Sequence, residues 1–256
     1  AQRNDAAVVI LGRAMGEAMD NRPEPGGYYL TEAEKALLAQ VTGAFRKVCV
    51  VVDAGNIMDL SWVEEYPIGA LLYAFQGGME SGNALIDVLY GDAQPGGRLT
   101  DTVPRHYEDA PSYGHFGGRD FNEYREDIYV GYRYYETFAQ DKVLYPFGFG
   151  LSYTTFRVES AAETWQTNWD LRIQVTNTGS RPGRQVVQVY VEAPQGRLGK
   201  AARVLADYWK TPELAPGQSA AVSLWIDLKS LASFDDSGVT GHPYAYVLEA
   251  GAYRLY

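Results

Sequence analysis

Three carboxylates and a guanidinium group lie close together at residues 17–24, within the loop at residues 12–29. The side chains are those of Glu17, Asp20, Arg22 and Glu24, and the Gly and Pro content around them favours a shaped loop over a helix. Carboxyl groups in such a loop suit acid/base chemistry. They also suit a plainer role as solvated loop charges, and charge alone does not decide between the two.

A second candidate acid, Glu126, lies in a segment crowded with tyrosines, residues 124–136. Phenol groups interleaved with charges are typical of a packed interface. The structural alternative for Glu126 is therefore an ion pair with Arg125 or Arg133 that holds the segment. The aromatic side chains of this region are predicted to be largely buried: Tyr129, Tyr132, Tyr134 and Phe147.

The sequence predicts a strand, a helix and a second strand that would position the first loop. The all-apolar run 6–11 followed by Gly predicts a buried strand of a parallel sheet, so the loop leaves that strand at its carboxyl end. Thr31 and Glu34 match a helix capping box, and apolar residues follow at helical spacing. A second apolar strand, 48–52, completes a βαβ unit. Open sheets of this type bind ligands at the carboxyl ends of their strands.

The alternation of predicted strands and helices continues along the chain. Residues 69–75 predict a third buried strand, 81–90 a helix and 99–103 a further short strand. Cys49 lies inside an apolar run, which predicts a buried core thiol that has no partner for an intrachain disulfide. The glycines near residue 78 match no phosphate-binding motif, so no nucleotide site is expected.

Beyond residue 154 the pattern changes to period two, which is typical of antiparallel strands. Clean alternation and regularly spaced turns predict an immunoglobulin-like β-sandwich with strands at 171–177, 186–191, 203–209, 221–228, 244–248 and 253–256. This half holds no catalytic type of residue cluster, and a stabilising role is predicted for it. The fold class is thus α/β followed by all-β, with 1–115 an α/β domain, 116–154 a Tyr- and Gly-rich interdomain segment and 155–256 the β-sandwich.

The amino-acid composition excludes some classes of binding partner. The chain has 256 residues, a formal net charge of -10 and 46% hydrophobic residues. Acidic balance argues against nucleic acid or an anionic membrane as the main partner and favours a neutral small substrate. No stretch approaches a spanning helix, so we expect a soluble protein, already processed or cut from something longer, either cytoplasmic or secreted. No cofactor or metal is expected, and a homo-oligomer is left open.

Several motifs together resemble the C-terminal half of glycoside hydrolase family 3, the β-glucosidase family that retains anomeric configuration. They include Gly16-Glu17, the Gln-Gly-Gly at 76–78, the Pro-Gly-Gly-Arg-Leu at 95–99 and two motifs in tandem at 126–135 and 147–156. The resemblance covers nearly the whole chain. It implies the later part of an α/β sandwich domain followed by a fibronectin type III-like domain.

The same resemblance implies roles for residues. Glu17 occupies the glutamate position of the family's Gly-Glu-Gly-x-Asp-Arg loop and would be the general acid/base, with Glu126 the second candidate. Asp20 and Arg22 would contact the sugar. Ala18 stands where the family often has Gly, and Asn21 where it often has Arg. The nucleophilic aspartate would lie on a (β/α)8 barrel, of which no motif is present here, so the chain is expected to be incomplete as an enzyme.

A hypothesis from another class is a non-catalytic carbohydrate-binding or interaction module, for which an α/β domain and a sandwich would suffice. The missing nucleophile motif favours that hypothesis, and Gly16-Glu17 favours part of a β-glucosidase, with β-xylosidase as a variant. The preferred linkage and aglycone do not follow from the sequence.

Overall fold

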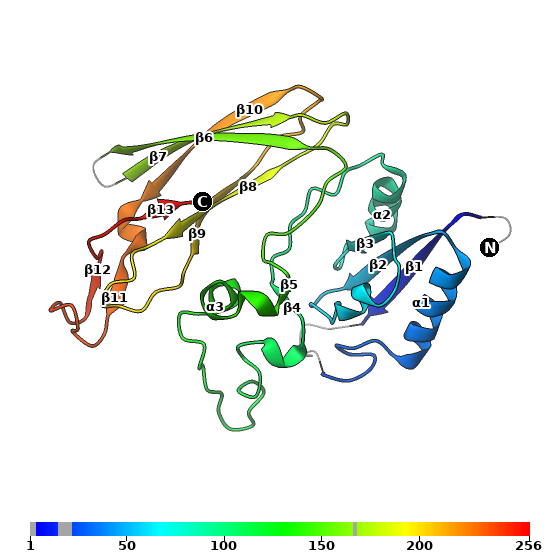
Figure 1. Ribbon diagram of the computed structural model, residues 1–256, viewed down its shortest axis with the longest axis horizontal. Coiled ribbons are helices and arrows are strands. Elements are labelled where there is room, and N and C mark those ends of the chain that lie inside the picture. Colours follow the sequence, from blue (N-terminus) through cyan, green and yellow to red (C-terminus); the bar gives the residue numbers. More distant parts are fainter. Residues whose placement is uncertain (1–3, 15–21, 166–167) are drawn as a thin grey trace. The chain divides into compact units, whose positions relative to one another are not determined.

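The computed structural model describes residues 4–14, 22–165 and 168–256, which form two compact units. Figure 1 shows their elements in chain order. Unit 1 contains Ala1–Ala93, Asp101–Glu123 and Asp141–Phe147, and unit 2 contains Gln94–Thr100, Tyr124–Gln140 and Gly148–Tyr256. Each unit is therefore assembled from separate stretches of the chain. The domain boundaries at 115 and 154 stay a prediction.

Unit 1 is built on a three-stranded parallel sheet of order β1-β2-β3. The strands are β1 (Ala6–Arg13), β2 (Lys47–Ala54) and β3 (Ala70–Tyr73). Helix α1 (Glu32–Ala44) joins the first two strands and packs against both, so the predicted βαβ unit is confirmed. The capping box is also present, because the Thr31 side chain accepts from Glu34 and the Glu34 side chain accepts from the Thr31 backbone.

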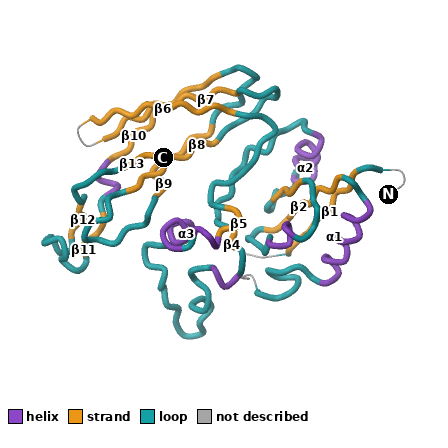
Figure 2. Tube along the Cα trace, in the orientation of Figure 1, coloured by secondary structure: helices purple, strands orange, loops and turns teal. Residues whose placement is uncertain are grey.

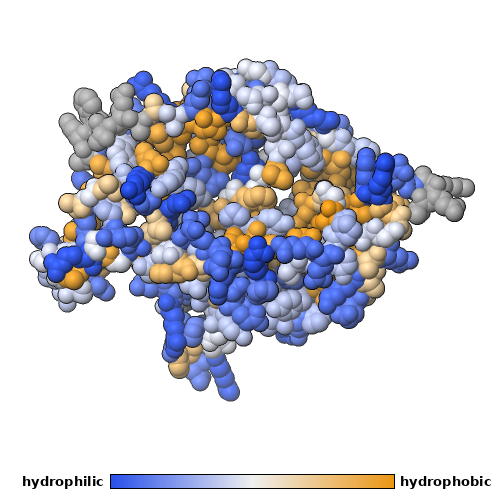
Figure 3. Space-filling view, viewed as in Figure 1, coloured by the Kyte–Doolittle hydropathy of each residue, from blue (hydrophilic) through white to orange (hydrophobic). Residues whose placement is uncertain are grey.

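Strand β1 is buried on one face only, which corrects the prediction of a buried strand. Val9 and Leu11 are 5% and 1% exposed, whereas Val8 and Ile10 are 51% and 59% exposed. Within the described residues β1 is an edge strand, and its second face has no layer over it. Hydrophobic surface is visible over this sheet in Figure 3.

The rest of unit 1 is short elements and loops. Helix α2 (Ser81–Tyr90) matches the predicted helix. The predicted strand at 99–103 is wrong for most of its length, since β4 (Val103–Pro104) pairs with β5 (Val143–Tyr145) over a very short ladder. Leu99 instead forms two isolated backbone hydrogen bonds, with Gly148 and Phe149. Cys49 is a free thiol that is only partly buried, and burial raises its pKa.

Unit 2 is a β-sandwich, as predicted. One sheet has the order β10-β7-β6 and the other β13-β8-β9 (Figure 2). The strands are β6 (Phe156–Trp165), β7 (Asn168–Asn177), β8 (Val186–Glu192), β9 (Val204–Lys210), β10 (Ser219–Asp227) and β13 (Arg254–Leu255). Buried residues from both sheets share one core, which includes Ile173, Val175 and Val191. The alternation of apolar and polar residues along β7 produces this core, because every second side chain points inward.

The Tyr-rich segment contains a helix that the sequence pattern did not indicate, α3 (Tyr132–Phe138). This helix docks within unit 2: the Tyr132 hydroxyl accepts a hydrogen bond from the Leu205 backbone at 2.8 Å, and Thr137 accepts from Ala202 at 2.9 Å. The predicted burial of the aromatic residues is met in part. Tyr129, Tyr132, Tyr134 and Phe147 are all partly buried, and the deeply buried ring is that of Tyr135, at 4% exposure.

A fully buried carboxylate organises the hairpin of β11 (Ser233–Asp235) and β12 (Ala245–Val247). Asp235 accepts hydrogen bonds from the backbones of Gly238, Val239 and Thr240 and from the Thr240 hydroxyl. Burial by itself would raise the pKa of Asp235, but these hydrogen bonds outweigh it and lower the pKa to about 2.

No helix within the described ranges is long and apolar enough to cross a bilayer.

Candidate active-site loop

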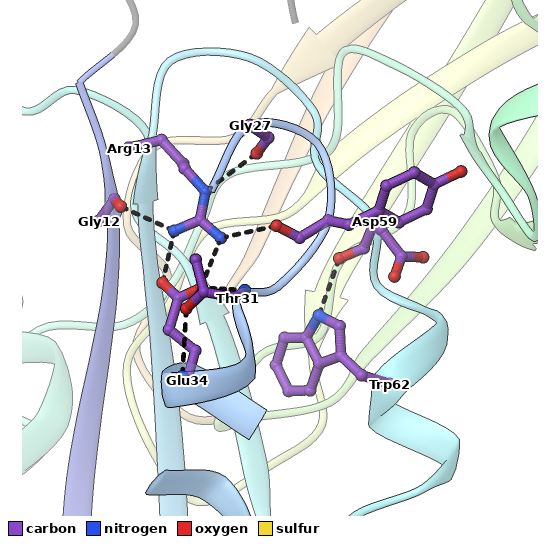
Figure 4. A network of polar contacts seen from close by, with 8 residues as sticks. Gly12, Arg13, Gly27, Thr31, Glu34, Asp59 and Trp62 are labelled. Carbon is purple, nitrogen blue, oxygen red and sulfur yellow. Dashed lines mark hydrogen bonds and ion pairs between the residues drawn. The ribbon is translucent and has the colours of Figure 1, made fainter. Parts of the chain in front are cut away.

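Both ends of the loop at residues 12–29 are fastened by one side chain, that of Arg13. Arg13 is the last residue of β1 and is 8% exposed. Its guanidinium donates to the Glu34 carboxylate at 2.6 and 3.0 Å, and to the Gly27 carbonyl at 2.9 Å (Figure 4). Further bonds go to the carbonyls of Gly12 at 2.9 Å and Tyr29 at 3.3 Å. A planar guanidinium with five donors in a fixed fork is suited to holding several acceptors at once.

Glu34 links this anchor to helix α1. Its carboxylate accepts from the Thr31 backbone at 2.8 Å and from the Thr31 hydroxyl at 3.0 Å, while it also accepts from Arg13. Burial would raise the pKa of Glu34, but the hydrogen bonds from Arg13 and Thr31 hold that pKa below its usual value. The same side chain therefore caps the helix and binds the end of β1.

The second half of the loop is a tight, self-bonded turn. The Arg22 carbonyl accepts from the backbones of Glu24 at 2.8 Å and Tyr28 at 2.9 Å, and the Glu24 carbonyl accepts from Gly27 at 3.0 Å. A Cβ atom at Gly27 would lie 2.5 Å from the Arg22 carbonyl oxygen, so only glycine fits there. The described part of the loop thus has a defined backbone.

The turn rests on a buried aromatic layer. Tyr28 is 5% exposed, and its ring lies edge-on to those of Tyr29 and Tyr107 at 5.1 and 5.0 Å between centroids. The Tyr28 carbonyl accepts from the Asp59 backbone at 3.0 Å, and the Asp59 carbonyl accepts from the buried Trp62 indole at 2.8 Å. These contacts connect the loop to the segment that follows β2.

The structure describes some of the predicted site residues and not others. Glu17 and Asp20 lie outside the described residues. Arg22 is described and solvent-exposed, and its guanidinium is 3.8 Å from the Glu24 carboxylate. Among the described residues, this is the one ion pair of its side chain.

Glu126, the second candidate acid, lies in unit 2 and is partly buried. Its carbonyl accepts from the Tyr129 backbone at 2.8 Å. The described residues show no ion pair between its carboxylate and Arg133, and the two interpretations of Glu126 stay predictions. The described ranges also contain no group of three or more His, Cys, Asp or Glu residues that could hold a metal ion.

Sequence reasoning missed Arg13 and the second role of Glu34. One signal was available: Arg13 is a cation at the end of an otherwise apolar strand, where a buried charge requires a partner. The partner is 21 residues away along the chain, and its acidic side chain was already assigned to the capping box.

A comparison with known protein families identifies the family of this chain. The sequence profile of the glycosyl hydrolase family 3 C-terminal domain matches residues 1–153. The chain belongs to glycosyl hydrolase family 3. A fibronectin type III-like domain profile matches residues 185–256 of this family 3 chain, which confirms the resemblance drawn from the motifs.

Two similar proteins are named β-glucosidases, in agreement with the family. The chain is 43% identical to a β-glucosidase of Ruminococcus albus, with all of this chain and 27% of that protein aligned. It is 38% identical to β-glucosidase A of Butyrivibrio fibrisolvens, with 98% of this chain and 35% of that protein aligned. The chain therefore spans only about a third or less of the length of the curated relatives it matches.

Solved structures of family members have the same fold. A β-glucosidase from Paenibacillus barengoltzii superposes with a TM-score of 0.95 at 46% identity, covering 99% of this chain and 29% of that one. β-Glucosidase 3B from Thermotoga neapolitana, in complex with glucose, gives a TM-score of 0.90 at 37% identity, covering 99% of this chain and 36% of that one.

Proposed function

We propose that this chain is the part of a retaining β-glucosidase that supplies the general acid/base, Glu17, to a nucleophile carried by a (β/α)8 barrel. The barrel is either part of the same polypeptide or a separate chain. The substrate is a small carbohydrate with a terminal, non-reducing β-linked sugar. Glucose is the preferred sugar in this proposal, and xylose is the variant.

The observation that carries the proposal is the anchoring of the loop at residues 12–29. Arg13 and Glu34 tie the loop's two ends to the carboxyl end of β1 and to the start of α1. Ligands bind at this end of parallel strands, and a catalytic group needs a supporting frame that holds its geometry. Relatives named β-glucosidases support the substrate class.

Retaining hydrolysis needs two carboxyl groups about 5 to 5.5 Å apart. The nucleophile attacks the anomeric carbon while the acid protonates the leaving oxygen, and the same acid then removes a proton from the incoming water. Glu17 is assigned this second role. A general acid must be protonated when the substrate binds, so its pKa must be raised by desolvation or by a nearby carboxylate, and the barrel would supply both. Asp20 and Arg22 are assigned to hydroxyl groups of the sugar.

The test compares leaving groups in the enzyme that contains the barrel. General acid catalysis is worth about 10² to 10⁴-fold, and its value rises as the leaving group needs a proton more. Glu17→Ala should therefore slow alkyl glucosides and disaccharides strongly, yet spare the glycosylation step with activated phenol leaving groups. Added azide should restore turnover and yield the β-glycosyl azide.

Glu126→Ala is the matched control, since Glu126 is the other candidate acid. We expect this variant to keep the wild-type dependence on the leaving group and to show no azide rescue. If Glu126→Ala shows both effects and Glu17→Ala neither, the two roles must be exchanged. The chain without a barrel should not hydrolyse aryl β-glucosides, and robust turnover by the pure chain would overturn the proposal.

A further inference from the structure

The outer face of the sheet β10-β7-β6 in unit 2 carries a hollow that the proposed catalytic role does not use. The hollow has a volume of about 570 Å³ and is lined by residues from all three strands. The hollow is shallow and largely open to solvent. The hollow lies in the β-sandwich of unit 2.

Small residues leave the space, and long polar residues border it. Ala161 on β6 and Ala221 on β10 flank the central strand, where Arg172 and Gln174 point outward. In the ladder, Ala221 lies opposite Gln174 and Ser223 lies opposite Arg172. Methyl groups rise little above a sheet, so the hollow is bordered by a guanidinium, an amide, a hydroxyl group and the carboxylate of Glu159, which lies opposite Gln174 on β6.

A tryptophan extends this surface along β10. Trp225 follows Ser223 by two residues, so it is on the same face, about 7 Å further along the strand. Its side chain is 60% exposed. A large exposed aromatic ring beside polar groups offers a flat apolar surface with hydrogen-bonding groups at its edge.

The residue directly opposite Trp225 is Asp170. One oxygen of the Asp170 carboxylate is buried and has no hydrogen-bond partner among the described residues, and the other is 4.0 Å from the Arg172 guanidinium. The unpaired oxygen is closed to solvent, so a ligand would reach this carboxylate through its other oxygen. Hydroxyl groups of a ligand can donate to that second oxygen and can accept from Arg172 and Gln174.

We propose that this face is a non-catalytic binding site for a β-linked gluco-oligosaccharide, in which the choice of sugar and linkage rests on the proposed function. The C–H face of a sugar ring would stack on Trp225, and the hydroxyl groups would bind Arg172, Gln174 and Ser223. Charge on the described part of this face is mixed, because Glu159 lies 3.6 Å from Arg157 and Asp170 lies 4.0 Å from Arg172, and this supports a neutral polyol. A nucleic acid would need clustered cations, and a protein partner would need a broader apolar core.

The experiment measures binding of cellohexaose to the 256-residue chain by calorimetry, with maltohexaose as the α-linked comparison. We expect Trp225→Ala to weaken cellohexaose binding at least tenfold. Tyr208→Ala is the matched control, because Tyr208 is 65% exposed on β9 of the other sheet, and it should bind like the wild type. Ala221→Trp fills the hollow without removing a native side chain, and it should also weaken binding.

Each other outcome overturns the proposal. The site is refuted if the wild type does not bind cellohexaose at millimolar concentration, or if Trp225→Ala and Ala221→Trp bind as the wild type does. Equal binding of maltohexaose refutes the assigned linkage. If sedimentation shows a dimer that Trp225→Ala converts to a monomer, the face is an interface between copies of the chain and not a sugar site. Since no residue of this face has a part in the proposed acid/base role, failure here leaves that role untouched.

Discussion

Replacing Arg13 by methionine tests whether one guanidinium holds the catalytic loop. Methionine keeps much of the aliphatic stem but leaves the Glu34 carboxylate without its cation and the carbonyls of Gly27 and Tyr29 without their donor. Breaking a buried ion pair costs about 3 to 5 kcal/mol. The Arg13 side chain is 4% exposed and that of Glu34 21% exposed, so we expect the lower end, about 3 kcal/mol, because water can reach part of the carboxylate.

For unit 1 this loss corresponds to a fall of roughly 12 °C in melting temperature, at about 4 °C per kcal/mol. Calorimetry at pH 7 would measure it, as the transition assigned to this unit. Arg46→Met is the matched control: its partner Asp5 is 3.6 Å away and both side chains are more than 75% exposed. An exposed pair contributes at most about 1 kcal/mol, so the control should shift the transition by only a few degrees.

Equal, small shifts in the two variants would refute the reasoning. A second readout is pH. Because the folded pKa of Glu34 is lowered, its contribution is present above about pH 4.3, the unfolded value, and is lost as pH falls through the lower folded value. The difference between wild type and Arg13→Met should therefore shrink on acidification. A constant difference from pH 7 to pH 3 would contradict the role of this ion pair.

Two further predictions concern single buried features. Asp235→Asn should destabilise unit 2 at pH 7, because the new amide nitrogen cannot accept from the Thr240 backbone. Since the folded pKa of Asp235 is about 2, the stabilisation by its carboxylate is complete above about pH 4 and is lost towards pH 2. The melting temperatures of variant and wild type should therefore converge over that range, and a constant difference would refute the assignment. Gly27→Ala should destabilise unit 1, since the added Cβ would lie 2.5 Å from the Arg22 carbonyl oxygen. Gly43→Ala, in helix α1 with nothing within 4 Å of the added Cβ, should instead stabilise unit 1 by about 0.4 to 1 kcal/mol. Thermal melts that rank the two variants the other way would show that the turn can relax.

Much of the fold could be predicted because its signals are local. The capping box at Thr31 and Glu34, the apolar strand before it and the period-two pattern of β7 each depend on residues close together in sequence, and these three features are present. The order of sheet and sandwich followed from the change of period. The family assignment followed from motifs rather than from these patterns.

The misses have physical causes of a different kind. Helix α3 begins after Gly131 and contains four aromatic residues, a composition that favours packing over helix formation, and its docking to the backbone at Leu205 and Ala202 stabilises it. Strand β6 has weak alternation and is held by its long pairing with β7. The Arg13 anchor depends on contacts that exist only once the sheet and helix have folded.

The open edge of β1 has a practical consequence for anyone who produces this chain on its own. On the side away from β2, the described residues leave the backbone of β1 unpaired, and Val8 and Ile10 are exposed beside it. Such an edge is a template for strand addition by another molecule, and natural proteins blunt it with a charge or a covering element. A lysine in place of Ile10, on the open face, would act as a gatekeeper against self-association while the core residues Val9 and Leu11 stay in place.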